Sequence, residues 1–166
     1  MEKIYILCVD DEPDVLRAVA RDLAPLEEAF PVETASSADE AKKLIGEILD
    51  KGDRAGLILC DHVMPGQSGV DLMIELRERP EMDDARMVLF TGQAGHEDTI
   101  EAINRAGITR YIAKPWDREV LLGIARNELS SFIIASGRDP LPYMRYLDRE
   151  RLADYVHRRN RTDTGQ

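Results

Sequence analysis

The pattern of hydrophobic and polar residues alternates between two periods along most of the chain. Continuous apolar runs occur at 4–9, 57–60 and 87–90, and two further strand candidates lie at 32–35 and 108–113. Such runs are typical of parallel strands that are buried on both faces. Between them, apolar residues recur at helical spacing in the segments 13–23, 37–48, 68–76, 96–106 and 117–135. The pattern therefore predicts a strand followed by a helix, repeated five times.

Residues that begin or end helices stand at the expected places between these runs. Pro13 suits the first turn of a helix, and Ser37 with Glu40 forms a capping box at the start of another. Gly107 is typical of the residue that follows a helix. In the fourth predicted helix, the spacing of the apolar residues predicts that Ile100 faces inward.

Strands that alternate with helices form parallel sheets, because right-handed crossovers bring each strand back in the same direction. We therefore expect an α/β fold with an open, doubly wound parallel sheet and helices on both faces. In such folds the binding crevice lies at the carboxyl ends of the strands. The residues directly after each strand are the first candidates for function.

Composition narrows the function classes. The 166 residues include 22 Lys and Arg against 32 Asp and Glu, giving a net charge of −10. Nucleic-acid binding is disfavoured, because phosphate contacts need clustered cations. The apolar runs are too short to span a membrane and the N-terminus resembles no signal peptide, which predicts a cytoplasmic protein. Cys8 and Cys60 are too few for a disulfide framework and are expected to be buried thiols.

Five polar residues directly follow the predicted strands. Asp10 and Asp11 follow the first strand, Asp61 the third, Thr91 the fourth and Lys114 the fifth. Clustered carboxylates repel one another, so they need a counter-charge to stay ionised. Oxygen ligands suit Mg²⁺, while an ammonium and a hydroxyl can meet phosphate oxygens. The set predicts Mg²⁺-dependent phosphoryl transfer in which Asp61 would be the nucleophile.

Each of these residues alone has a common structural explanation, since acids cap helices and Thr-Gly or Lys-Pro pairs form turns. Their joint occurrence at successive strand ends favours a functional site. The runs 9–13 (Val-Asp-Asp-Glu-Pro) and 61–69 (Asp-His-Val-Met-Pro-Gly-Gln-Ser-Gly), with Thr91-Gly92 and Lys114-Pro115, resemble the receiver domain of bacterial two-component response regulators. The resemblance covers about residues 3–135.

The resemblance implies a flavodoxin-like (βα)5 fold with strand order 2-1-3-4-5 and a role for each motif residue. Asp61 would accept the phosphoryl group from a sensor histidine kinase or a phosphotransfer protein. Asp11, Asp61 and the backbone carbonyl of Val63 would ligate Mg²⁺, while Asp10 would act through a metal-bound water. Lys114 would pair with the phosphate.

The resemblance also implies how a signal would leave the site. Thr91 would move toward the phosphate, and Tyr111 would follow it. The surface formed by the fourth helix, the fifth strand and the fifth helix would bind a downstream partner, an output module or a second copy of the chain. Val63 and Gln93 hold the two positions that tune acyl-phosphate lifetime. The Lys114–Pro115 peptide bond is expected to be cis.

A change in composition separates a predicted receiver at 1–136 from an extension at 137–166. The segment 138–166 holds seven Arg and five acids, a net charge of +2, which leaves −12 for the first 137 residues. Gly137, Pro140 and Pro142 interrupt helical structure at the junction. We expect a partly helical extension or the beginning of an output region from a longer regulator. Its length is too short for a DNA-binding domain with its own core.

Three interpretations of function remain open. The first is a signalling switch that assists only its own phosphorylation and dephosphorylation and is otherwise not an enzyme. The second is an acyl-phosphate phosphatase resembling the haloacid-dehalogenase class, which usually has a second Asp where this chain has Val63. The third is a docking module that is never phosphorylated, which the complete acidic set and Lys114 disfavour. The switch is the favoured interpretation.

Overall fold

The structure is a computed structural model that describes residues 1–92 and 100–165. Five parallel strands form one sheet in the order β2-β1-β3-β4-β5. The strands are β1 (Ile4–Val9), β2 (Val32–Ala35), β3 (Arg54–Asp61), β4 (Arg86–Thr91) and β5 (Ile108–Ala113). The predicted α/β fold and strand order are confirmed. β3 begins three residues earlier than its apolar run, because its first residues pair with the start of β1.

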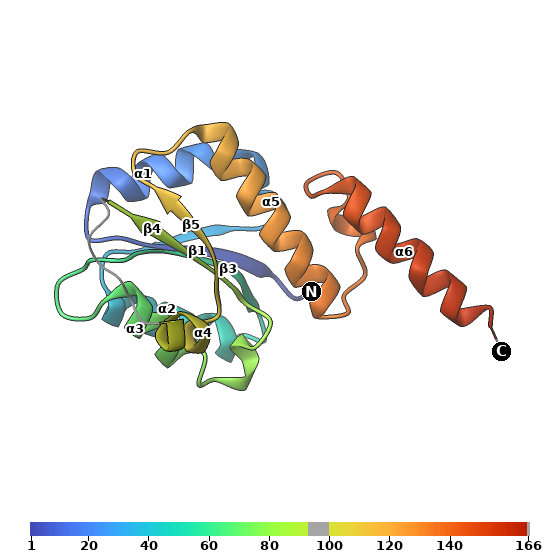
Figure 1. Cartoon of the computed structure of the whole chain (residues 1–166), viewed down its shortest axis with the longest axis horizontal. Helices are drawn as coiled ribbons and strands as arrows, with labels where there is room; N and C mark the ends of the chain where they lie inside the picture. The colour runs from blue at the N-terminus through green and yellow to red at the C-terminus, as the bar shows by residue number, and fades with distance from the viewer. Residues whose placement is uncertain (93–99, 166) are drawn as a thin grey trace.

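Helices cover both faces of the sheet (Figure 1). One face carries α1 (Pro13–Asp22) and α5 (Arg118–Ala135), and the other carries α2 (Ala38–Asp50), α3 (Gly69–Leu76) and α4 (Ile100–Ala106). Three short 3-10 helices lie at Ala24–Leu26, Pro80–Met82 and Leu141–Tyr143, and α6 (Arg149–Asp163) follows the last of them. Among the described residues, no helix is long and apolar enough to cross a membrane.

Polar side chains cap the beginning of α2, as the sequence predicted, and the beginning of α5. The Ser37 hydroxyl accepts a hydrogen bond from the Glu40 backbone N–H at the start of α2. The Glu40 carboxylate in turn accepts hydrogen bonds from the backbone N–H and the hydroxyl of Ser36, the residue before Ser37. Asp117 caps α5 in the same way, by accepting from the backbone N–H groups of Glu119 and Val120. Local side-chain chemistry thus sets where these two helices begin.

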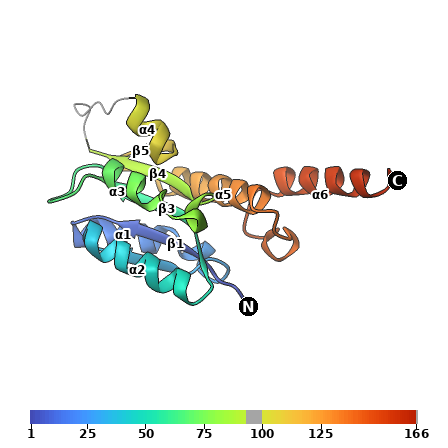
Figure 2. The ribbon, with the colours of Figure 1, turned by 90° about the horizontal axis from the view of Figure 1, so that it is seen from below.

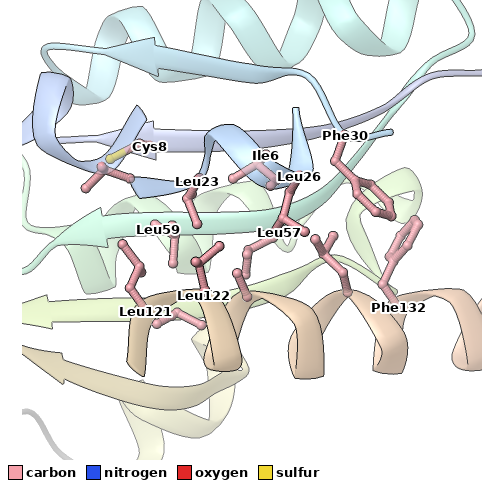
Figure 3. Close-up of a cluster of buried hydrophobic side chains, with 14 of the residues drawn as sticks. Ile6, Cys8, Leu23, Leu26, Phe30, Leu57, Leu59, Leu121, Leu122 and Phe132 are labelled. Atoms are coloured by element: carbon pink, nitrogen blue, oxygen red, sulfur yellow. The ribbon is translucent and has the colours of Figure 1, made fainter. Parts of the chain in front are cut away.

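The sheet separates two hydrophobic clusters. Ile6, Leu57 and Leu59 lie on the α1–α5 face, where Figure 3 shows them packed against Leu121 and other buried side chains of the two helices. The second cluster lies beneath α2, α3 and α4. Successive strand residues alternate between the two clusters, as the period of a strand requires.

Ile100 does not face inward as the helical spacing predicted; its side chain is 78% exposed. The reason is that α4 packs on α3 mainly through its carboxyl end, where Ala106 is buried. The Arg77 guanidinium from the end of α3 donates hydrogen bonds to the Ala106 and Gly107 carbonyl oxygens. This contact anchors the last turn of α4, while the Ile100 side chain stays outside the core.

The residues after α5 pack onto the domain instead of lying free in solvent. Tyr143 stacks on Phe30 with 5.2 Å between ring centroids, and Leu147 and Leu152 are buried in the cluster on the α1–α5 face. Arg138 makes a two-pronged ion pair with Glu2. Figures 1 and 2 show α6 projecting beyond the end of the sheet at which β1 begins. The outer part of α6, residues 157–163, is exposed.

Candidate functional site

Three carboxylates meet at the carboxyl edge of the sheet. Asp10 follows β1 directly, Asp11 comes next, and Asp61 is the last residue of the neighbouring β3. Each offers an oxygen, and these oxygens lie within 4.8 Å of one another. Asp10 is fully buried and Asp61 nearly so, whereas Asp11 is exposed. The structure therefore brings together the three acids that the sequence singled out.

Lys114 supplies the counter-charge. Its ammonium lies 2.7 Å from Asp10 Oδ2 and 3.1 Å from Asp61 Oδ1. The Lys114 backbone N–H donates to the Thr91 carbonyl oxygen over 2.8 Å, which ties the lysine to the end of β4. The Lys114–Pro115 peptide bond is cis, as expected. One ammonium thus bridges acids from two strands.

Backbone contacts hold Asp61 in place. Gly69, at the first turn of α3, donates its backbone N–H to the His62 carbonyl oxygen over 2.9 Å. A Cβ atom at Gly69 would collide with the backbone carbonyl of Asp61, so only glycine allows α3 to approach this closely. Gly66 has a φ of +86°, which lets the intervening loop turn back toward α3. Gly66 and Gly69 therefore allow the loop and α3 to pack closely enough to hold Asp61 in place.

Burial and neighbouring charges shift the acid–base equilibria of the site. Burial raises the pKa of Asp61, and the nearby carboxylates of Asp10 and Asp11 add to this, while Lys114 opposes it. Burial alone would lower the pKa of Lys114, but its hydrogen bonds to Asp10 and Asp61 outweigh burial and raise it. Lys114 therefore stays charged at neutral pH, and the excess negative charge of the site favours a cation.

The other predicted site residues lie around this cluster. Thr91 ends β4 and is partly exposed, and Tyr111 lies in β5 with 49% of its surface exposed. Val63 is in the loop two residues after Asp61 and is 58% exposed. It offers an apolar side chain to this loop and no group that could activate water. Gln93, the second predicted lifetime position, lies outside the described residues.

The donor set fits a hard divalent cation. Asp10, Asp11 and Asp61 present only oxygen atoms, and the exposed Asp11 leaves room for bound water on one side. Cations such as Mg²⁺ favour a few carboxylates and several waters over an all-protein cage. The cluster can therefore bind a metal ion, and Mg²⁺ is the ion that its chemistry favours.

Comparison with known proteins shows the family of the chain. Residues 6–126 match the family of response regulator receiver domains. The chain belongs to this family. This receiver is 40% identical to the hydrogenase transcriptional regulatory protein HoxA of Cupriavidus necator over 127 residues, which are 76% of this chain and 24% of HoxA.

Two further comparisons agree. The transcriptional regulatory protein AruR of Pseudomonas aeruginosa is 31% identical over 122 residues, covering 74% of the chain and 48% of AruR. A CheY-like receiver domain protein from Methanospirillum hungatei has 27% identity and a TM-score of 0.58, covering 73% of this chain and 90% of that one. The receiver thus spans less than half the length of these two curated relatives.

Several contacts of this receiver escaped sequence reasoning. The buried carboxylate of Asp22, at the end of α1, accepts a hydrogen bond from the Trp116 indole over 2.9 Å. Glu128 of α5 is buried between Arg86 and Arg110. Neither acid stands in a recognisable motif, and each occupies a helix position at which an acid is usually solvated. Only the tertiary structure reveals their partners.

Proposed function

We propose that this receiver is a phosphorylation-controlled switch that carries a phosphoryl group on Asp61. The observation behind the proposal is the position of Asp61 beside Asp10, Asp11 and the Lys114 ammonium. Two further acids raise the negative charge around the acceptor, and one fixed cation meets the oxygens of an incoming phosphoryl group. Family membership supports the same role for the site.

The reaction moves one phosphoryl group between two proteins. An Asp61 carboxylate oxygen forms a bond to phosphorus while the bond from phosphorus to the imidazole nitrogen of a phosphohistidine breaks. The imidazole nitrogen keeps the electron pair of that bond. Mg²⁺ held by Asp11, Asp61 and the Val63 carbonyl, with Asp10 behind a bound water, would neutralise phosphoryl-oxygen charge. Receiver domains interact with histidine kinases, so a sensor kinase or a phosphotransfer protein is the proposed donor.

Phosphorylation would redistribute the contacts of the site. In the unphosphorylated structure the Lys114 ammonium bridges Asp10 and Asp61. The acyl phosphate would place nearly two negative charges beside this ammonium. The Thr91 hydroxyl would donate to a phosphoryl oxygen, and Tyr111 would repack behind it. The exposed apolar side chains of Ile100, Tyr111 and Val120 support α4, β5 and α5 as the proposed responding face. A downstream partner, an output module or a second copy would bind there.

The proposal assigns signalling to this receiver rather than steady turnover. The Val63 side chain cannot act as a general acid or base, so a phosphatase of the haloacid-dehalogenase type lacks the carboxylate it needs two residues after its nucleophile. The signalling pathway depends on proteins outside this chain. The same holds for the output of any longer regulator that contains these residues. The short coverage of HoxA and AruR favours such a longer regulator.

Intact-mass spectrometry after incubation with acetyl phosphate and Mg²⁺ tests the proposal. The parent protein should gain one phosphoryl group, and Asp61→Asn should gain none. Asp71→Asn is the matched control, because Asp71 is an exposed aspartate on α3, outside the cluster. Chelating Mg²⁺ should prevent uptake in the parent. Equal uptake by Asp61→Asn and the parent would exclude Asp61 as the acceptor, and release of phosphate from a small phosphomonoester over many turnovers would favour a phosphatase.

A further inference from the structure

The last residue of α1 is a buried acid in an unfavourable place. Asp22 is 5% exposed, and it lies at a helix carboxyl end, where the helix dipole disfavours negative charge. Burial of a carboxylate is costly unless hydrogen bonds replace water. Two side chains do so: the Trp116 indole N–H donates to Oδ2 over 2.9 Å, and Arg21 Nε lies 3.3 Å from Oδ1. Arg21 is largely exposed, so Trp116 is the partner on the protein side.

Trp116, the only tryptophan of the chain, also contacts a residue that neighbours the proposed phosphoryl acceptor. Its ring contacts Phe90 with 5.1 Å between ring centroids. Phe90 is fully buried and pairs with Asp61 across β3 and β4, and it directly precedes Thr91. The indole therefore rests on the residue that lies between the phosphoryl acceptor and the proposed switch threonine.

The contact between Trp116 and Asp22 joins the loop that follows Lys114 to the end of α1. Lys114 lies two residues before Trp116, and its ammonium is bonded to Asp10. The chain leaves Asp10 to enter α1, which ends at Asp22. The segment 114–116 is thus attached to the segment 10–22 at both ends, by an ion pair at one end and by the indole hydrogen bond at the other. Such double attachment restricts where the lysine can lie.

We propose that the hydrogen bond from Trp116 to Asp22 positions Lys114 across the acidic cluster, which makes Trp116 a positioning residue for phosphoryl uptake. The proposal rests on the proposed function of Asp61. Trp116 touches no reacting atom and acts through Lys114 and Phe90. A phosphoryl group that draws Lys114 away from Asp10 would pull on the same segment, so the environment of the indole should report occupancy of the site.

Variants that separate the hydrogen bond from folding test this role. Trp116→Phe keeps a ring against Phe90 but removes the donor. Trp116→Phe combined with Asp22→Leu removes both partners and leaves no buried polar group unsatisfied, which is far less damaging to stability than removing one. Asp22→Asn keeps an oxygen that accepts from the indole and serves as the conservative rescue. Thermal unfolding verifies that each variant is folded.

The rate of phosphoryl uptake from acetyl phosphate at saturating Mg²⁺ is the first readout. The Phe/Leu double variant should react about tenfold more slowly, within the ~100-fold that a misplacement of 1 Å can cost. The uptake rate of Asp22→Asn should stay within about twofold of the parent rate, because asparagine still accepts the indole hydrogen bond and leaves Lys114 in place. A folded double variant that reacts as fast as the parent overturns the positioning role. A parent that takes up no phosphoryl group overturns the proposed function, and this inference with it.

Tryptophan fluorescence gives a second readout that does not depend on the stability of the Trp116 or Asp22 variants. Mg²⁺ with fluoroberyllate, which mimics a phosphoryl group on a carboxylate, should change the emission of Trp116 in the parent. Asp61→Asn, which lacks the carboxylate, should show no change. Binding of fluoroberyllate detected by fluorine NMR without any change in emission would contradict a link between the indole and the site.

Discussion

Gly69 illustrates how one residue serves both the fold and the site. Its backbone N–H bonds to the His62 carbonyl, and a Cβ atom there would overlap the carbonyl oxygen of Asp61. A side chain at this position would have to push α3 away from the end of β3. The Asp61 carboxylate would then lose its fixed place relative to Asp10.

Gly69→Ala and Gly123→Ala should therefore change stability in opposite directions. Gly69→Ala should lower the free energy of unfolding by about 2 kcal/mol, because overpacking a tight contact costs this much. Gly123 is an exposed residue inside α5 with open space around it, so alanine should raise stability by about 1 kcal/mol through helix propensity. Urea denaturation of the two variants measures both values. A stabilising Gly69→Ala would contradict the close approach of α3 to Asp61.

The charge of Asp61 should cost stability when no metal is bound. Its pKa is raised in the folded state by burial, with help from Asp10 and Asp11, so ionisation at neutral pH opposes folding. Asp61→Asn should therefore unfold at a higher temperature than the parent at pH 7 in metal-free buffer. As the pH falls through the folded pKa of Asp61, the parent becomes protonated and this advantage should shrink.

Thermal unfolding of the parent and of Asp61→Asn from pH 7 down to about pH 4, near the ordinary pKa of aspartate, measures this dependence. Mg²⁺ should reduce the difference at pH 7 by stabilising the parent. An advantage of Asp61→Asn that stays constant across this pH range would mean that the carboxylate charge is not its source.

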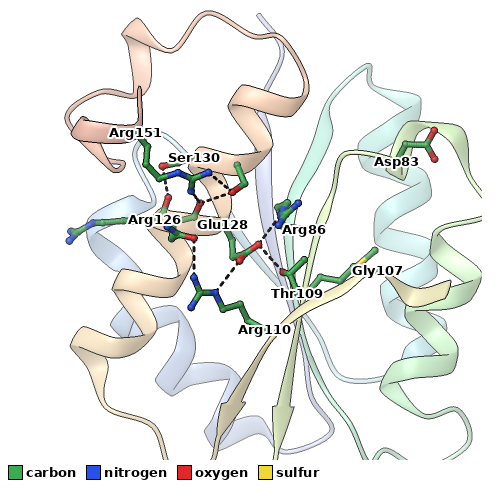
Figure 4. A network of polar contacts seen from close by, with 12 residues as sticks. Asp83, Arg86, Gly107, Thr109, Arg110, Arg126, Glu128, Ser130 and Arg151 are labelled. Atoms are coloured by element: carbon green, nitrogen blue, oxygen red, sulfur yellow. Dashed lines mark hydrogen bonds and ion pairs between the residues drawn. The ribbon is translucent and has the colours of Figure 1, made fainter. Parts of the chain in front are cut away.

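At the scale of elements, Glu128 joins α5 to the edge of the sheet. Its carboxylate lies 2.8 Å from Arg86 Nε and 3.3 Å from Arg110 Nε, and it accepts a hydrogen bond from the Thr109 hydroxyl over 2.9 Å (Figure 4). The Glu128 side chain is 3% exposed. The buried Glu128 carboxylate thus joins β4, β5 and α5 through polar contacts. Two of these elements, β5 and α5, belong to the surface that we propose for signalling.

Glu128→Ala should lower the free energy of unfolding by about 2 kcal/mol, since the two arginines lose a buried partner but remain partly exposed to water. Glu47→Ala is the matched control, because Glu47 is an exposed glutamate in α2, and its effect should stay within about 0.5 kcal/mol. Urea denaturation measures both. Equal effects of the two substitutions would show that the buried carboxylate adds nothing to stability.

The elements that the sequence predicted best are those whose local signals agree with their tertiary setting. The apolar run 4–9 coincides with β1, and the capping box predicted at Ser37 and Glu40 begins α2. The prediction for Ile100 was wrong because the contact that places α4 is made by Arg77, a polar residue on another helix. Periodicity within one segment carries no information about such a partner.

The site was predictable for a different reason. Residues at the ends of parallel strands meet at one edge whatever the helices do, so Asp10, Asp61 and Lys114 converge as soon as the sheet forms. The contact between Trp116 and Asp22 depends instead on how α1 lies against the loop before α5. That packing follows from the whole core, and no residue spacing indicates it.

At the scale of the whole molecule, α5 connects the proposed phosphorylation site to the extension. It begins just after Lys114 and Trp116 and ends where residues 137–152 fold back onto it. Arg151 of α6 donates to the Asn127 carbonyl and to the Ser131 hydroxyl, and the Asp148 backbone N–H donates to the Ser130 hydroxyl. We therefore propose that the extension is held to the receiver as an appended structural unit.

Two truncations separate the packed part of the extension from its exposed part. Removal of residues 137–166 deletes Leu147 and Leu152 from the core and uncovers Phe30. A buried leucine contributes ~1.5–3 kcal/mol, so this truncation should lower the free energy of unfolding by at least about 3 kcal/mol. Removal of residues 157–166, of which 157–165 are exposed, should change it by less than about 0.5 kcal/mol. If both truncated proteins unfold at the same urea concentration, the extension does not stabilise the receiver.

The most direct test of the account is chemical localisation of the phosphoryl group. Borohydride reduces the carbonyl carbon of an aspartyl phosphate to an alcohol, with release of phosphate, and leaves free carboxylates unchanged. After phosphorylation with acetyl phosphate and Mg²⁺, peptide mass mapping should find this reduction at Asp61 and at no other aspartate. Reduction at Asp10 or Asp11, or at none of the three acids although phosphoryl uptake was measured, would contradict the assignment of Asp61 as the residue that carries the signal.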